Sequence, residues 1–141
     1  MVEVINRQRR RRMDTARWRE FAETALGEIG AGSEGATIVF VSDRGVRDLN
    51  RRFRGRNTPT DVLSFPTERA AFEQPEQLNL GDVVISVERA EAQAAEHGLA
   101  FDEELAQLIL HGLLHLCGYD HETDDGEMNR LEIRLRRRLG I

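Results

Sequence analysis

Three of the chain's four histidines fall within eleven residues, from His111 to His121. His111 and His115 are four positions apart in an apolar stretch that predicts a helix, so they lie roughly 40° apart on one face and about 6 Å apart along the axis. Gly118 stands where helices often end in the left-handed conformation, and a chain that reverses there can bring His121 to the same point. Three imidazole ligands with an open fourth position are typical of a catalytic zinc site. The spacing therefore predicts metal binding by His111, His115 and His121.

The spacing of these histidines matches that of the metzincin proteases except at one position. Those enzymes carry Glu directly after the first histidine, where it is the general base of the peptidase reaction. This chain has Gly112 there, which cannot accept a proton. A peptidase of that type is therefore not expected, and a metallohydrolase with another substrate fits better. Cys117 follows His115 by two residues, about 200° around the helix, which predicts a core thiol rather than a fourth ligand.

Length and composition indicate one ordinary domain, residues 1–141. The chain has 141 residues, 40% hydrophobic and 32% charged, which is typical of a soluble globular protein with its own core. It contains no apolar run of membrane-spanning length and no signal-peptide pattern at its N-terminus, so we expect no membrane partner. The single cysteine excludes an internal disulfide and fits a reducing cytoplasm.

The charge is unevenly distributed along the chain. Residues 1–60 hold 13 arginines and 8 acidic residues, whereas residues 61–141 hold 7 arginines and 17 acidic residues. All 20 basic residues are arginine, whose planar guanidinium suits phosphate recognition. Because the chain as a whole is acidic, with a net charge of −5, any RNA binding must use a local basic face. Arg44, Arg47 and Arg51 form such a stripe at helical spacing, which Arg54 continues.

The elements that must position these residues follow from hydrophobic periodicity and breakers. Strands are expected at residues 2–5, 36–41, 60–66 and 81–87, with the third at a sheet edge because Pro59 and Pro66 bound it. Helices are expected from Asp14 to about residue 29, from Asp43 to near Gly55, and over residues 88–97, 101–117 and 124–139. Residues 67–78 are expected to form a polar loop. The candidates for burial in the last helix are Met128, Leu131, Ile133, Leu135 and Leu139. Together these elements predict an α+β domain with a mixed sheet of about four strands and five helices, the metal site lying at the end of a core helix.

Three separate blocks resemble one known family, the bacterial rRNA maturation factor YbeY, a metal-dependent endoribonuclease. They are Arg54-Gly55 with Pro59–Pro66, then Leu80–Ile85, then His111–His121. The resemblance runs nearly end to end and implies a zincin-like fold with one zinc ion bound by His111, His115 and His121. It also implies cleavage of single-stranded RNA, in maturation of the small-subunit rRNA 3′ end and in ribosome quality control. The family's functional arginine falls on Arg54.

The residues also suggest how such an enzyme would work. Zinc lowers the pKa of water to about 7 and polarises a phosphoryl oxygen, and either that hydroxide or the substrate's 2′-OH can be the nucleophile. Arg54, the candidate catalytic residue, would stabilise the negative charge that develops on phosphorus-bound oxygens. A groove lined by the arginine stripe and the third strand, with zinc at its floor, would hold a single strand by its phosphates. Asp120 either orients a ligand imidazole or shapes the turn.

Two alternatives stay open at this point. The chain could be a ribosome-assembly factor in which zinc is structural, although structural sites usually have four protein ligands. It could also be a more general metallohydrolase or peptidase, which Gly112 disfavours. The expected partners are single-stranded RNA, chiefly rRNA, and the small ribosomal subunit or a protein associated with it; DNA is not expected. The expected location is the cytoplasm.

Overall fold

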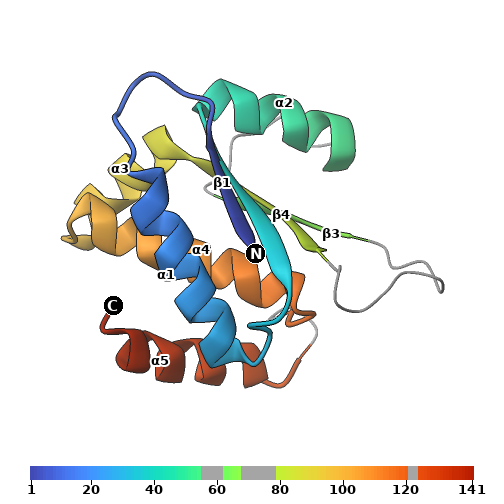
Figure 1. The fold of residues 1–141 in the computed structure, drawn as a ribbon. Coiled ribbons are helices and arrows are strands. Elements are labelled where there is room, and N and C mark those ends of the chain that lie inside the picture. Colours follow the sequence, from blue (N-terminus) through green and yellow to red (C-terminus); the bar gives the residue numbers. More distant parts are fainter. Residues whose placement is uncertain (55–61, 68–78, 121–123) are drawn as a thin grey trace.

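The computed structural model describes residues 1–54, 62–67, 79–120 and 124–141. Within these ranges, strands and helices follow one another nearly where the sequence predicts them (Figure 1). In chain order the elements are β1 (Val2–Asn6), α1 (Thr15–Ile29), β2 (Gly35–Val41), α2 (Asp43–Arg54), β3 (Val62–Pro66), β4 (Asn79–Ser86), α3 (Val87–His97), α4 (Phe101–Leu116) and α5 (Glu127–Leu139). Apart from Thr67, the predicted polar loop over 67–78 lies outside the described residues.

The four strands form one mixed sheet in the order β1-β2-β4-β3. β1, β2 and β4 are parallel, and β3 runs antiparallel to β4 at the edge. An edge position tolerates Pro66, which has no N–H to donate to a further strand. The predicted α+β fold, with about four strands and five helices, is confirmed.

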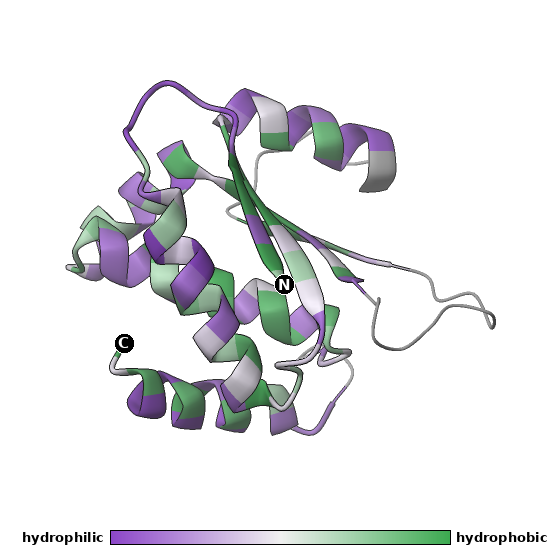
Figure 2. Cartoon of the chain, in the orientation of Figure 1, coloured by the Kyte–Doolittle hydropathy of each residue, from purple (hydrophilic) through white to green (hydrophobic). Residues whose placement is uncertain are grey.

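Helices cover the two faces of the sheet unequally. Figure 1 shows α1, α3, α4 and α5 on one side of the sheet and α2 on the other. The larger core lies on the four-helix side, where Leu105, Ile109 and Leu113 of α4 are fully buried. A smaller cluster beneath α2 joins Val46 to Leu63 and Val84. Figure 2 shows the same division, with apolar colour concentrated in the strands and α4 and polar colour along the outer faces of α2 and α5.

Side-chain caps set where several helices begin. The Asp14 carboxylate accepts a hydrogen bond from the backbone N–H of Arg17 at 3.1 Å, as predicted for the start of α1. Ser86 caps α3 in the same way, so Val87 begins the helix instead of ending the strand. The Asp124 carboxylate accepts from the backbone N–H of Met128 at 3.0 Å in the first turn of α5, and α5 begins at Glu127, after the predicted start.

One burial prediction in α5 is wrong. Ile133 is 44% exposed, whereas Glu132 is only 7% exposed. The reason is helical periodicity: four residues after the buried Met128 and three before the buried Leu135 stands Glu132, not Ile133. A carboxylate therefore occupies the inner face of α5.

His97, at the C-terminal end of α3, bonds to a buried carboxylate of α4. Its Nδ1 lies 2.9 Å from Oε2 of Glu104, whose side chain is 4% exposed. The hydrogen bond to Glu104 and the negative charge of that group raise the pKa of His97. The pair therefore links the charge state of His97 to the stability of the fold.

We expect His97→Gln to lower the melting temperature more at pH 6 than at pH 9. A raised pKa in the folded state means that the ionic contribution is complete below the unfolded value of about 6.5 and is lost as pH rises through the folded value. Thermal unfolding of both proteins across this range checks the expectation. A difference in melting temperature that does not change with pH would contradict it.

In the part of the chain that the structure describes, no helix combines the length and the apolar character needed to cross a lipid bilayer.

Candidate metal centre

His111 and His115 face each other on the last turns of α4. Their Nε2 atoms are 3.1 Å apart, and their rings meet edge to face with centroids separated by 4.7 Å. Both side chains are half-buried. The predicted convergence of these two imidazoles is therefore present in the structure.

The turn after α4 fixes the orientation of His115. Gly118 adopts φ +97, a left-handed conformation that suits glycine, and its N–H donates to the His115 carbonyl at 3.0 Å. The reversed chain brings the Tyr119 carbonyl oxygen to 2.9 Å from His115 Nδ1. A carbonyl oxygen only accepts hydrogen bonds, so Nδ1 carries the proton and Nε2 is the unprotonated nitrogen of a neutral ring.

A carboxylate from another helix fixes the orientation of His111. Its Nδ1 donates to Oε1 of Glu132 on α5 at 3.0 Å, and Nη2 of Arg136 lies 3.6 Å from the same oxygen. Burial raises the pKa of Glu132, but the hydrogen bond from His111 and the nearby positive charges outweigh burial and leave this pKa below its ordinary value. Glu132 is therefore an anion at neutral pH, and sequence analysis did not identify it as part of the site.

The geometry of the two Nε2 atoms fits a shared cation. When both Nδ1 atoms carry the protons, two lone pairs face each other across 3.1 Å, which requires a proton or a cation between them. Two nitrogen ligands of tetrahedral zinc, with bonds of about 2.0–2.1 Å, lie roughly 3.3 Å apart. The third predicted ligand, His121, lies outside the described residues. Accordingly, the described residues by themselves include no group of three or more His, Cys, Asp or Glu side chains placed to hold an ion.

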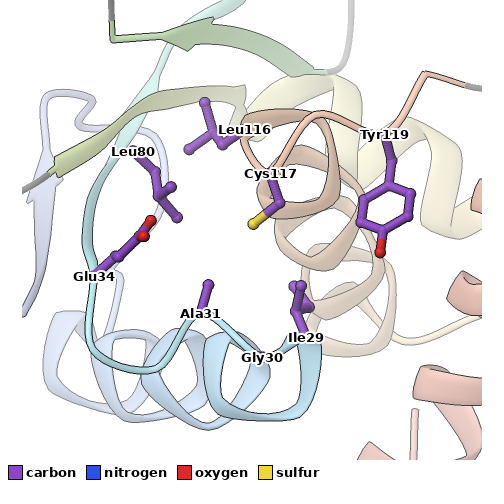
Figure 3. Close-up of a pocket in the computed structure, with 8 residues that line it drawn as sticks. All are labelled: Ile29, Gly30, Ala31, Glu34, Leu80, Leu116, Cys117 and Tyr119. Atoms are coloured by element: carbon purple, nitrogen blue, oxygen red, sulfur yellow. The ribbon is translucent and has the colours of Figure 1, made fainter. Parts of the chain in front are cut away.

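Cys117 lies away from the two histidines. It lines a pocket of about 290 Å³, and Figure 3 shows its sulfur pointing into that space between Leu80, Ala31 and Ile29. Burial, with a smaller effect of the Glu34 carboxylate, raises the pKa of the thiol. A thiol that resists ionisation is a poor zinc ligand, in agreement with the predicted core role of Cys117.

Of the two roles predicted for Asp120, the contacts among the described residues support the one in the turn. The Nδ1 atoms of His111 and His115 bond to Glu132 and to the Tyr119 carbonyl. The Asp120 side chain is exposed, and its backbone carbonyl accepts from the Asp124 N–H at 3.2 Å, which shapes the turn. Any role toward His121 lies outside the described residues.

At Gly112, α4 packs closely against the sheet. A Cβ at this position would lie 2.5 Å from Cγ1 of Val83 and 3.4 Å from Cγ2 of Val62. The Ser64 hydroxyl of β3 donates to the Gly112 carbonyl at 3.2 Å, which gives Ser64 a structural role. The glutamate of a metzincin would therefore meet β4 at this position, so the site does not accommodate the peptidase base.

The predicted arginine groove is wrong for the described part of the stripe. Arg44, Arg47 and Arg51 are exposed, but α2 covers the opposite face of the sheet from α4 (Figure 1). These arginines border a surface depression with three acidic residues, namely Asp43, Asp48 and Glu88. The side chain of Arg54, the last residue of α2, lies outside the described part of the structure.

Comparisons with known proteins agree on one family along the whole chain. A family profile described as "Endoribonuclease YbeY" matches residues 3–140. The endoribonuclease YbeY of Geobacter sulfurreducens is 40% identical over 136 residues, which cover 96% of this chain and 91% of that protein. The corresponding protein of Geobacter metallireducens is 38% identical, covering 99% of this chain and 94% of that protein.

A solved structure extends the similarity to three dimensions. The solution structure of TM1509 from Thermotoga maritima matches with a TM-score of 0.64 and 27% identity, covering 99% of this chain and 89% of that chain. The matched profile, the relatives and the paired histidines of α4 lead to the same conclusion. The chain belongs to the endoribonuclease YbeY family and is a nuclease.

Proposed function

We propose that the chain is a zinc-dependent endoribonuclease that cleaves single-stranded RNA during rRNA maturation, notably at the 3′ end of small-subunit rRNA, and in ribosome quality control. It would act in the cytoplasm with the small ribosomal subunit or a protein associated with it. Family membership supports the RNA substrate. The observation that carries the zinc is the pair of facing Nε2 atoms of His111 and His115, 3.1 Å apart.

The proposed site assigns a task to each group around it. His111, His115 and His121 would hold one zinc ion and leave its fourth position open to solvent or substrate. When bound, zinc supplies Lewis-acid chemistry for a phosphoryl oxygen and lowers the pKa of water. Glu132 and the Tyr119 carbonyl keep the two donor nitrogens pointed at one place.

Arg54 is the proposed catalytic residue. Cleavage of a phosphodiester passes through a phosphorus centre whose equatorial oxygens gain negative charge, and a guanidinium can donate two parallel hydrogen bonds to such oxygens. The other arginines of α2 have no part in the proposed site, because they are exposed on the opposite face of the sheet beside Asp43, Asp48 and Glu88.

The test is cleavage of an RNA that spans the 3′ end of small-subunit rRNA, at constant Mg²⁺, before and after treatment with a zinc-selective chelator. We expect the single-stranded RNA to be cleaved, cleavage to stop with the chelator, and about one zinc ion per chain to restore it. The same RNA annealed to its complement should resist cleavage. Cleavage that persists in protein shown to be free of metal would contradict zinc dependence. Zinc-loaded protein that binds the small subunit but cleaves no RNA would favour the assembly-factor alternative.

A further inference from the structure

Glu132 is an acidic residue on the inner face of a helix. Its neighbours along that face, Met128 and Leu135, are both buried, and Glu132 itself is 7% exposed. Burying a carboxylate is unfavourable unless hydrogen bonds and opposite charges compensate for the lost water. An apolar residue would pack at this position without that cost, so the contacts of the carboxylate need an explanation.

The contacts of Glu132 point to the metal centre. Its Oε1 accepts from His111 Nδ1 at 3.0 Å and lies 3.6 Å from Nη2 of Arg136, one turn further along α5. One oxygen therefore joins a histidine of α4 to an arginine of α5. Arg136 is four residues from Glu132 on the same helix, so this ion pair forms within α5.

We propose that Glu132 is a positioning residue for the metal site, a role that rests on the proposed zinc binding by His111. The carboxylate oxygen accepts the hydrogen bond from Nδ1 at 3.0 Å, so this contact favours the His111 tautomer that carries hydrogen on Nδ1 and has Nε2 unprotonated. The same hydrogen bond fixes the ring so that Nε2 faces Nε2 of His115. Glu132 thus makes α5 part of the site although it contributes no ligand.

A second pair in the same protein provides a comparison. At the other end of α4, buried Glu104 bonds to Nδ1 of His97 at 2.9 Å. The chemistry and the length of this bond are nearly those of the Glu132 pair, but His97 is largely exposed and is not a proposed ligand. Loss of the Glu104–His97 bond should therefore change the stability of the fold about as much as loss of the Glu132–His111 bond, without changing zinc affinity.

The experiment measures zinc dissociation constants by competition with a chelator of known affinity for the wild type, Glu132→Gln and Glu104→Gln. We expect Glu132→Gln to weaken zinc binding about 10- to 100-fold, the range found when an outer partner of a ligand histidine is removed. Glu104→Gln should leave the dissociation constant within about twofold of the wild-type value. Glu132→Asp, which keeps the charge but is one methylene shorter, should fall between Glu132→Gln and the wild type.

A second readout needs no metal. Nitrogen-15 NMR of the metal-free protein at a pH where its histidines are neutral reports which ring nitrogen carries the proton. We expect His111 to carry it on Nδ1 in the wild type and to populate the other tautomer in Glu132→Gln, while His97 is unchanged. The same spectra report whether each variant is folded.

The outcomes separate this inference from the proposed function. Zinc affinity and a His111 tautomer that are both unchanged in Glu132→Gln would overturn the positioning role. An equal loss of affinity in Glu104→Gln would also overturn it, because general destabilisation would then be the cause. A wild-type protein that binds no zinc, with His111 in the expected tautomer, would instead contradict the proposed metal site.

Discussion

His115→Ala is expected to lose both zinc and RNA cleavage while keeping its fold. The substitution removes one of three proposed ligands, and the two that remain do not complete a stable site. Loss of the Lewis acid removes several kcal/mol of transition-state stabilisation, so cleavage should fall by about 10³-fold or more. Alanine favours the helix, and His115 is only half-buried, so the melting temperature of the metal-free protein should change little. Elemental analysis, RNA cleavage and thermal unfolding measure the three quantities.

The control for His115→Ala is Arg54→Ala, because Arg54 is not one of the proposed zinc ligands. It should retain about one zinc ion per chain, while cleavage falls roughly 10²- to 10³-fold through loss of one charge-stabilising group. Binding of both variants to the small ribosomal subunit completes the comparison. Normal cleavage by His115→Ala would contradict the catalytic role of the metal site, and loss of zinc from Arg54→Ala would contradict the separation of tasks.

Gly112→Ala is expected to destabilise the protein even though alanine is the better helix former. The new Cβ would lie 2.5 Å from Cγ1 of Val83, a fully buried residue of the sheet. Overpacking of this kind costs typically about 1–3 kcal/mol, occasionally more, and it exceeds the helix-propensity gain of up to about 1 kcal/mol. Relief of the clash would move α4 away from β4 and displace His111, so cleavage should also fall. Denaturant unfolding gives the change in the free energy of unfolding.

Gly27→Ala in α1 is the matched control. A Cβ at Gly27 meets no atom within 4 Å, so only the propensity difference remains. This variant should be more stable by up to about 1 kcal/mol and should cleave RNA normally. The two substitutions are chemically identical, but we expect them to change the free energy of unfolding in opposite directions. Stabilisation by Gly112→Ala would show that α4 does not approach β4 as closely as the structure indicates.

The close approach at Gly112 also gives a physical reason for the missing peptidase base. From the sequence, glycine at this position means only that no proton acceptor follows the first histidine. In the structure the same glycine brings α4 against Val83 and Val62 and accepts a hydrogen bond from Ser64. A glutamate here would have to displace the sheet. Glycine in place of the metzincin glutamate therefore affects how α4 packs as well as which groups can accept a proton.

Most of the fold follows from local signals in the sequence. Asp14 marks a helix start through its side-chain cap and Gly118 marks a helix end through its left-handed backbone, and both do so in the structure. The edge position of β3 follows from Pro66, which lacks a donor for a further strand. Ile133 is exposed although it is apolar, because the 3.6-residue period of the helix places Glu132 on the buried face.

The candidate site could be predicted only in part. The spacing of His111 and His115 is enough to predict that their side chains meet, because four residues on a helix set that geometry. The contact of His115 with the Tyr119 carbonyl could not be predicted from the sequence, because every residue has a backbone carbonyl. Glu132 is separated from His111 by 21 residues, and no local pattern joins them. Its position between Met128 and Leu135 was the one available signal, because an acid on a buried stripe needs a partner.

Zinc X-ray absorption on the protein purified with its metal, beside the His121→Ala variant, tests the proposed metal site most directly. We expect three imidazole nitrogens and one further light atom at roughly 2.0–2.1 Å from zinc, and no sulfur near 2.3 Å. His121→Ala should show one imidazole fewer or no zinc at all. A sulfur ligand, which only Cys117 or a methionine could supply, or a wild-type spectrum with fewer than three imidazoles, would contradict the claim that His111, His115 and His121 share one ion.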